Sequence, residues 1–176
     1  MVKRIVLFAL QQRLFLILIS SLFVVFGLVS FQSLPIEAFP DITDVQVNVL
    51  DVKRDERGWL TEVLRCGHLN SGQQMAQLFV TVGNPGKTKG KHYHTRKTEW
   101  FCVTSGNAKL YLKDVRNHEE QIIPMGESNM VTVMIPPHVA HAITCSGTQP
   151  FYLIVVASEE FNPKDADTYG FDFPEL

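Results

Sequence analysis

Residues 90–99 read GKHYHTRKTE, and with Gly106 they complete the pattern G-x-HxH-x4-E-x6-G. Side chains of a β-strand alternate between its two faces, so His92 and His94 are expected to point the same way. The carboxylate of Glu99, five residues further on and beyond a short turn, can return to the same spot. Two imidazoles and a carboxylate are ligands of first-row divalent metals. The pattern therefore predicts a metal site, with Gly106 in the tight turn before the next strand.

A fourth ligand is available downstream. Residues 130–135, MVTVMI, are typical of a strand, and PPHVAH follows at residues 136–141. The two prolines end the strand and stiffen the turn. His141 then opens a short strand over residues 142–144, which would bring a third imidazole to the site.

These two patterns together resemble the two sequence motifs of the cupin superfamily. The second motif usually reads P-x-G-x-x-H, and His138 stands where the glycine is expected. The resemblance implies a jelly-roll fold with His92, His94, Glu99 and His141 as metal ligands. Zn²⁺ is the preferred ion, with Fe²⁺, Mn²⁺ and Ni²⁺ as alternatives.

The chain from residue 51 onward has the texture of an all-β domain. Apolar or alternating runs at residues 75–82, 100–103, 107–112, 121–123, 130–135 and 151–157 are separated by breaks rich in Gly, Pro and Asn. Short strands at this spacing favour an antiparallel β-sandwich or barrel. We expect two parts: residues 1–50, with one hydrophobic helix and a linker, and residues 51–176, the cupin domain.

Composition excludes some functions. The 176 residues carry a formal net charge of −2 and the pI is about 6.3, so nothing indicates a nucleic-acid partner. The three cysteines have no CxxC spacing and no even framework, which favours reduced thiols over a disulfide scaffold.

Residues 14–31, LFLILISSLFVVFGLVSF, contain no charge. Eighteen helical residues span about 27 Å, close to the hydrocarbon thickness of a bilayer. Lys3, Arg4 and Arg13 precede the run, and the next basic residue is Lys53. The segment is therefore predicted to cross the membrane with the N-terminus inside. A buried helix of a globular protein is the alternative.

Residues 1–49 also resemble the extreme N-terminus of heavy-metal efflux pumps of the resistance-nodulation-division type, through the basic start, the apolar helix and the stretch LPIEAFPDIT. The remaining chain has no relation to a pump. We interpret the segment as the product of a fused or misjoined reading frame, with a functional anchor as the alternative. The first interpretation places the cupin chemistry in the cytoplasm. The second makes the protein a single-pass inner-membrane protein.

A narrower resemblance covers residues 51–170. The stretches DERGWLTEVLR, GNPGKTKGKHYHTRKTEWFCVTSG, IPPHVAHAI and SEEFNPKDADTY are similar to the C-terminal domain of bacterial capsular-polysaccharide enzymes that convert a UDP-4-keto-sugar toward UDP-N-acetyl-L-fucosamine. The resemblance implies C3 epimerisation by a zinc-containing cupin. The glycine-rich nucleotide loop of that family's reductase domain is missing from this sequence. The same G-x-H-Y core is similar to dTDP-4-dehydrorhamnose 3,5-epimerase.

Epimerisation at C3 beside a C4 ketone needs a base, stabilisation of the enolate oxygen and an acid. His92 is the candidate base if the metal is absent or structural. Tyr93, Tyr111 and Tyr152 are candidate acids, and the sequence does not choose among them. A metal bound by all four protein ligands would need to expand its coordination to polarise the ketone.

Several further residues are candidates for substrate binding. Lys89, Lys91, Arg96 and Lys97 crowd the first motif and are suited to a diphosphate, although solvated loop charges are the ordinary alternative. Arg57 and Glu62 match the RGxLTE stretch of the resembled family, and His138 is a candidate at the rim.

Three functions remain open. The first is a UDP- or dTDP-4-keto-6-deoxy-sugar epimerase in capsular or surface polysaccharide biosynthesis. The second is a non-catalytic metal- or sugar-binding cupin that partners a separate reductase, and the third is an Fe(II)-dependent dioxygenase. A homodimer through sheet edges of the cupin domain is expected, because exposed strands need a cover.

Overall fold

The computed structural model describes residues 17, 19–26 and 42–176. The chain divides into two units, Met1–Ala38 and Phe39–Leu176.

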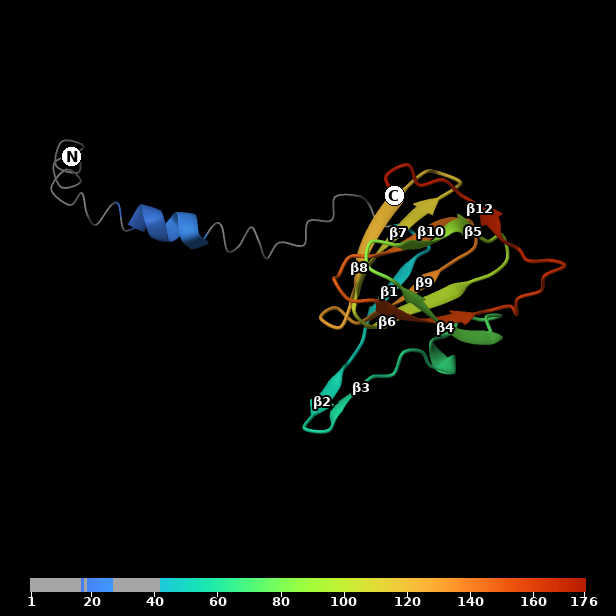
Figure 1. The fold of residues 1–176 in the computed structure, drawn as a ribbon, viewed down its shortest axis with the longest axis horizontal. Helices are drawn as coiled ribbons and strands as arrows, with labels where there is room; N and C mark the ends of the chain where they lie inside the picture. The colour runs from blue at the N-terminus through green and yellow to red at the C-terminus, as the bar shows by residue number, and fades with distance from the viewer. Residues whose placement is uncertain (1–16, 18, 27–41) are drawn as a thin grey trace. The chain divides into compact units, whose positions relative to one another are not determined.

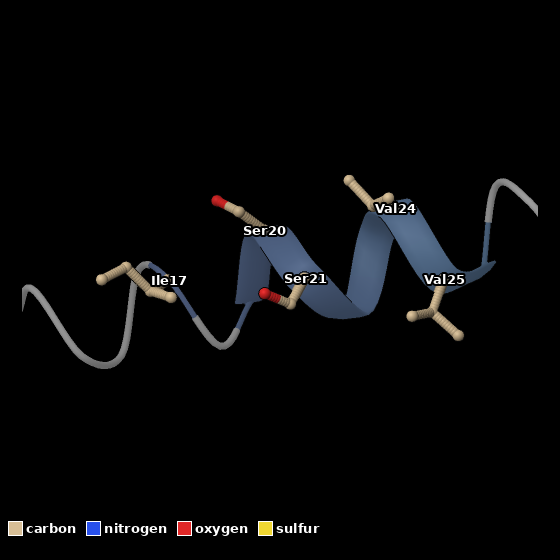
Figure 2. A pocket seen from close by; sticks show the side chains of 5 residues that line it. All are labelled: Ile17, Ser20, Ser21, Val24 and Val25. Carbon is tan, nitrogen blue, oxygen red and sulfur yellow. The ribbon is translucent and has the colours of Figure 1, made fainter.

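In the first unit, residue 17 and residues 19–26 are helical. Ile17, Ser20, Ser21, Val24 and Val25 line an open depression at this helix (Figure 2). Within the described residues, no helix has the length and apolar character needed to cross a membrane. Most of the predicted span, residues 14–31, lies outside the part of the chain that the structure describes.

The second unit consists of two five-stranded antiparallel sheets (Figure 1). The first has the order β1-β9-β6-β11-β4, and the second β12-β5-β10-β7-β8. The strands of the first sheet are β1 (Gln46–Val49), β4 (Gln77–Gly83), β6 (Glu99–Ser105), β9 (Val131–Ile135) and β11 (Phe151–Ala157). Those of the second are β5 (Thr88–Tyr93), β7 (Asn107–Asp114), β8 (Glu120–Gly126), β10 (Val139–Cys145) and β12 (Tyr169–Gly170). The prediction of an antiparallel β-sandwich with an N-terminal helix is confirmed.

The core lies between these two sheets, because alternate residues of their strands are apolar. Leu110 and Leu112 of β7 are buried, as are Val133 of β9 and Leu153 of β11. Burying each such side chain contributes about 1.5–3 kcal/mol. The strands packed around this interior carry or adjoin the predicted metal ligands.

Gly106 occupies the predicted turn between β6 and β7. Its φ of 75° is left-handed, and a Cβ at this position would lie 2.5 Å from the carbonyl oxygen of Pro150. Only glycine fits without displacing backbone, so the conformational reason for the glycine of the first motif is confirmed.

The sandwich also uses residues before position 51. Ile42 is 1% exposed, and β1 pairs with β9 from Gln46↔Met134 to Val49↔Val131. The sheet therefore begins ahead of the expected start of the cupin domain. A separate hairpin follows, formed by β2 (Lys53–Asp55) and β3 (Gly58–Leu60), and then a 3₁₀ turn, η1 (Cys66–His68).

Candidate metal centre

Two neighbouring strands and one strand of the facing sheet bring the predicted ligands together. His92 lies near the end of β5 and pairs directly with His141 of β10. His94 follows β5, and Glu99 is the first residue of β6 in the other sheet. His141 lies inside β10 instead of ahead of its strand, because the strand already begins at Val139.

A β-bulge sets the direction of the first two histidines. His92 pairs with His141 but Gly90 pairs with Ala142, so Lys91 is the extra residue. Gly90 and Lys91 have φ values of 87° and 60°. A Cβ on Gly90 would lie 2.8 Å from the carbonyl oxygen of His141. Bulges beside functional sites redirect side chains, and here the glycine permits the close approach that the bulge requires.

The four predicted ligands form one cluster. One donor atom from each of His92, His94, Glu99 and His141 lies within 4.8 Å of the others. The Oε2 atom of Glu99 is 3.5 Å from Nε2 of His94 and 3.3 Å from Nε2 of His141. His94, Glu99 and His141 are buried, and His92 is partly buried.

Each histidine turns its second ring nitrogen toward a backbone carbonyl. His94 Nδ1 contacts the carbonyl oxygen of Asp167, and His141 Nδ1 lies 3.2 Å from that of Val139. The ring of His92 is hydrogen-bonded to the backbone of Gly90. Metal-binding histidines use this arrangement to fix the tautomer that leaves the other nitrogen free.

The free nitrogens have no other partner. Nε2 of His94 and Nε2 of His141 are buried without a hydrogen bond. Buried polar atoms are rarely left unpaired, and an unbound ion is one explanation when they are. Two imidazole lone pairs facing one carboxylate oxygen fit a divalent cation, which all three would bind.

Burial and mutual proximity shift the pKa values of His92, His94 and Glu99. Burial and the neighbouring imidazoles lower the pKa of His92 to about 4, so this ring is neutral at pH 7. Burial alone would raise the pKa of Glu99, but the adjacent rings of His141 and His94 hold it well below its usual range. Burial opposes a charge on His94, but the adjacent Glu99 carboxylate raises the pKa of its ring. A cation could replace the proton that the negative carboxylate attracts.

A pocket of about 390 Å³ opens onto this cluster. Its wall combines three of the cluster residues with polar, cationic and aromatic side chains: Gln77, Phe79, His92, His94, Lys97, Glu99, Ala157, Phe161 and Thr168. Phe79 and Phe161 are 37% and 60% exposed, so both aromatic rings remain accessible at the mouth. Lys97 is only 5% exposed, and its Nζ donates to the carbonyl oxygen of Ala166 at 3.2 Å.

Within the described residues, the three candidate tyrosines do not line this pocket. Tyr93 stacks on Tyr169, with 5.3 Å between ring centroids. Tyr111 pairs with Ala142, and residues directly opposite share a face, so Tyr111 lies on the other side of the sheet from His141. Tyr152 is 47% exposed and lines a different depression, beside Glu127 and Gln149.

The candidate cations have different surroundings. Lys91 donates to the carbonyl oxygen of Leu176 at 2.6 Å, and Arg96 binds Asp165 at 3.0 Å. Lys89 is exposed on β5, opposite Ile143. Of these four side chains, only Lys97 lines the described pocket.

The remaining candidates also lie outside the pocket wall. Arg57 pairs with Asp55 in the β2–β3 hairpin, and Glu62 pairs with Arg65 at the surface. His138 has a φ of 67°, which explains why the cupin motif has glycine at this position. Its backbone N–H donates to the carbonyl oxygen of His94 at 2.7 Å.

Five pocket residues were not anticipated from the sequence: Gln77, Phe79, Ala157, Phe161 and Thr168. The last two belong to SEEFNPKDADTY, a stretch singled out only for its resemblance to the capsular enzymes. That similarity marked the segment without indicating which of its side chains reach the pocket.

Comparisons with known proteins agree with this architecture. The family "Polysaccharide biosynthesis C-terminal domain" matches residues 53–169. The spore coat polysaccharide biosynthesis protein SpsL of Bacillus subtilis is 29% identical over 131 residues, which cover 72% of this chain and 86% of SpsL. The UDP-2-acetamido-2,6-beta-L-arabino-hexul-4-ose reductase of Pseudomonas aeruginosa is 34% identical over 117 residues. That match covers 66% of this chain but only 30% of the reductase.

Solved structures share the fold of the sandwich. The capsular polysaccharide assembling protein CapF of Staphylococcus aureus has a TM-score of 0.55 at 29% identity, over 70% of this chain and 34% of CapF. The epimerase RmlC of Legionella pneumophila, solved with dTDP-4-keto-L-rhamnose, has a TM-score of 0.68 at 15% identity, over 77% of each chain. This second likeness shows the fold alone.

A separate match concerns a shorter piece of chain. Protein HelA of Legionella pneumophila is 43% identical over 49 residues, which make up 28% of this chain and 5% of HelA. The matched segment is as long as the N-terminal stretch, residues 1–49, that resembles the efflux pumps.

Proposed function

The chain belongs to the polysaccharide biosynthesis C-terminal domain family, and on that premise we propose that it is a metal-containing epimerase of nucleotide sugars. The substrate is a UDP- or dTDP-4-keto-6-deoxy sugar, and the reaction inverts C3 by removal and return of a proton. A relative named for spore coat polysaccharide biosynthesis and another named as a reductase of a UDP-linked hexul-4-ose support this substrate class.

One observation carries the proposal. Nε2 of His94 and Nε2 of His141 are both buried, both lack a hydrogen bond, and both lie within 3.5 Å of the same oxygen of Glu99. With His92 as fourth donor, these residues would hold one divalent ion, and Zn²⁺ suits the nitrogen and oxygen set. Bound by all four residues, such an ion would have to expand its coordination to supply Lewis-acid polarisation of the C4 carbonyl.

The pocket also offers charge stabilisation and contacts for the substrate. Negative charge develops on the C4 oxygen as the C3 proton leaves, and the buried ammonium of Lys97 offsets such charge. Phe79 and Phe161 offer aromatic surface to the sugar nucleotide. Gln77 and Thr168 can form hydrogen bonds to sugar hydroxyls.

The proposal is tested with the full chain. Metal content is measured by mass spectrometry, and solvent deuterium at C3 is followed by NMR after incubation of UDP- and dTDP-4-keto-6-deoxy sugars in D₂O. We expect about one ion per chain and deuterium incorporation, both lost in Glu99→Gln. His118→Asn is the matched control, because His118 is exposed and lies outside the cluster.

Other outcomes lead to different conclusions. Turnover without metal would contradict the ion's role and leave the neutral ring of His92 as base. Metal without turnover would favour a binding domain that partners a reductase. That second candidate is favoured by the 30% coverage of the Pseudomonas reductase. Oxygen consumption with bound iron would indicate a dioxygenase.

A further inference from the structure

Asp167 occupies an unusual position in the C-terminal segment. It is 3% exposed, and its φ of 45° is left-handed for a residue with a side chain. This conformation costs about 1–2 kcal/mol and persists only where the surrounding contacts fix it. Strain of this kind concentrates at functional sites.

The carboxylate of Asp167 holds the backbone that links the two halves of the first motif. It accepts hydrogen bonds from the backbone N–H of Thr95 at 3.0 Å, of Arg96 at 3.1 Å and of Lys97 at 3.0 Å. The hydroxyl of Thr95 adds a fourth at 2.6 Å. The turn between His94 and Glu99 is therefore fixed by a residue about 70 positions away in sequence.

The backbone of the same residue contacts a cluster histidine. Nδ1 of His94 lies against the carbonyl oxygen of Asp167. A carbonyl oxygen can only accept, so Nδ1 must carry a proton, and in the neutral ring Nε2 then carries the lone pair. That lone pair is directed toward Glu99 and lacks another partner.

We infer that Asp167 is the positioning residue of this site: its carboxylate anchors the turn at residues 95–97, and its carbonyl holds His94 in the tautomer and orientation that present Nε2 to the cluster. The consequence for metal affinity rests on the metal site proposed above. The orientation of His94 does not, because the hydrogen bonds exist without an ion.

The adjoining residues connect this anchor to the pocket. The carbonyl oxygen of Ala166 accepts from the buried ammonium of Lys97, and Thr168 lines the pocket beside it. Three consecutive residues of the C-terminal segment thus reach the site: Ala166 contacts Lys97, Asp167 contacts His94, and Thr168 lines the pocket. Displacing Asp167 would disturb all three.

The first test needs no variant and no metal. Long-range ¹H–¹⁵N NMR of the metal-free chain at neutral pH distinguishes the two neutral tautomers of a histidine and the protonated ring. We expect His94 to carry its proton on Nδ1, with or without a second proton on Nε2. A neutral ring protonated on Nε2 alone would overturn the inference.

The second test compares two aspartates of one segment. Asp167→Asn places an amide among backbone donors that it cannot satisfy, so we expect mixed His94 tautomers and a Zn²⁺ dissociation constant raised about 10–100-fold. The control is Asp165→Asn, whose side chain is 64% exposed and bound only to Arg96 in the described contacts. Loss of such a surface pair should change the affinity by less than about fivefold.

Co²⁺ substitution adds a readout of coordination geometry. We expect the visible absorption of the Co²⁺ protein to change in Asp167→Asn and to stay the same in Asp165→Asn. Thr95→Val removes only the hydroxyl bond, so it reports on the same anchor if Asp167→Asn does not fold. A folded Asp167→Asn with wild-type His94 tautomer and affinity would refute the inference. Failure of the wild type to bind metal would refute the metal centre, while the His94 tautomer still decides the positioning role.

Discussion

Zn²⁺ should stabilise the sandwich against heat, and Glu99→Gln should remove most of that effect. Glu99 is the cluster's negative charge, and its Oε2 lies 3.5 Å or less from two ring nitrogens. The amide of glutamine keeps the size of the side chain but removes the charge. The substitution therefore weakens the binding of a cation with little change in packing.

The size of the effect follows from binding linkage. An ion present at about 100 times its dissociation constant stabilises the folded state by about 2.7 kcal/mol. One kcal/mol raises the melting temperature of a domain of this size by about 3–5 °C, so the shift should be about 8–13 °C. If Glu99→Gln weakens binding about 100-fold, half occupancy leaves about 0.4 kcal/mol, or about 1–2 °C.

Thermal unfolding followed by circular dichroism, with and without Zn²⁺ after treatment with a chelator, measures both shifts. His118→Asn should retain the wild-type shift, because this exposed histidine is outside the cluster. Equal shifts in the wild type and in Glu99→Gln would mean that the ion binds elsewhere. No shift in the wild type at saturating Zn²⁺ would refute the metal centre itself.

Three further perturbations test other parts of the fold. His138→Gly should relieve a left-handed φ of 67° and stabilise the protein by up to about 1 kcal/mol in chemical denaturation. The gain is limited because glycine has more conformational freedom in the unfolded chain. A loss of stability above about 1 kcal/mol would contradict this account of the motif glycine. Asp114→Asn should destabilise the protein most above about pH 4, because the Arg116 guanidinium holds the pKa of the Asp114 carboxyl below its usual range. The stabilisation by Asp114 is present above the pKa of the unfolded state and is lost as the pH falls through the pKa of the folded state. The free energy of unfolding is measured for both proteins at several pH values, and a difference that grows toward low pH would refute this role of Asp114. Val80→Glu on the edge strand β4, where Leu78 and Val80 are 68% and 59% exposed, should convert the expected homodimer to a monomer in analytical ultracentrifugation; a variant that remains dimeric would exclude β4 from the interface.

The meeting of His92, His94, Glu99 and His141 was predictable because its geometry depends largely on local rules. Strand alternation places His92 and His94 on one face, and the prolines before His141 mark the end of one strand and the approach of the next. The all-β architecture follows from strand spacing in the same way. Both signals depend on residues close together in the sequence, so a single sequence is enough to recognise them.

The same alternation excludes Tyr93, because it lies between the two histidines and so faces the opposite way. The side of the sheet on which Tyr111 lies depends on the register of β7 against β10. Tyr111 pairs with Ala142, so its side chain points to the face opposite that of His141. Strand parity alone could not decide this without knowing the pairing partner.

The contribution of the C-terminal segment could not be predicted. Asp167 and Thr95 are separated by 72 positions, and an acidic, loop-like stretch near the end of a chain is usually solvated. Their contact depends on tertiary folding and on a left-handed backbone at Asp167. The start of the sandwich was difficult for a similar reason, because β1 is recognisable as a strand only through its pairing with β9.

The most direct test of the account is a crystal structure of the full chain grown with Zn²⁺, using anomalous scattering at the zinc edge. The account predicts one peak among His92, His94, Glu99 and His141, about 2.0–2.2 Å from Nε2 of His94, Nε2 of His141 and a Glu99 oxygen. A zinc peak elsewhere, with the two Nε2 atoms turned away from Glu99, would contradict it.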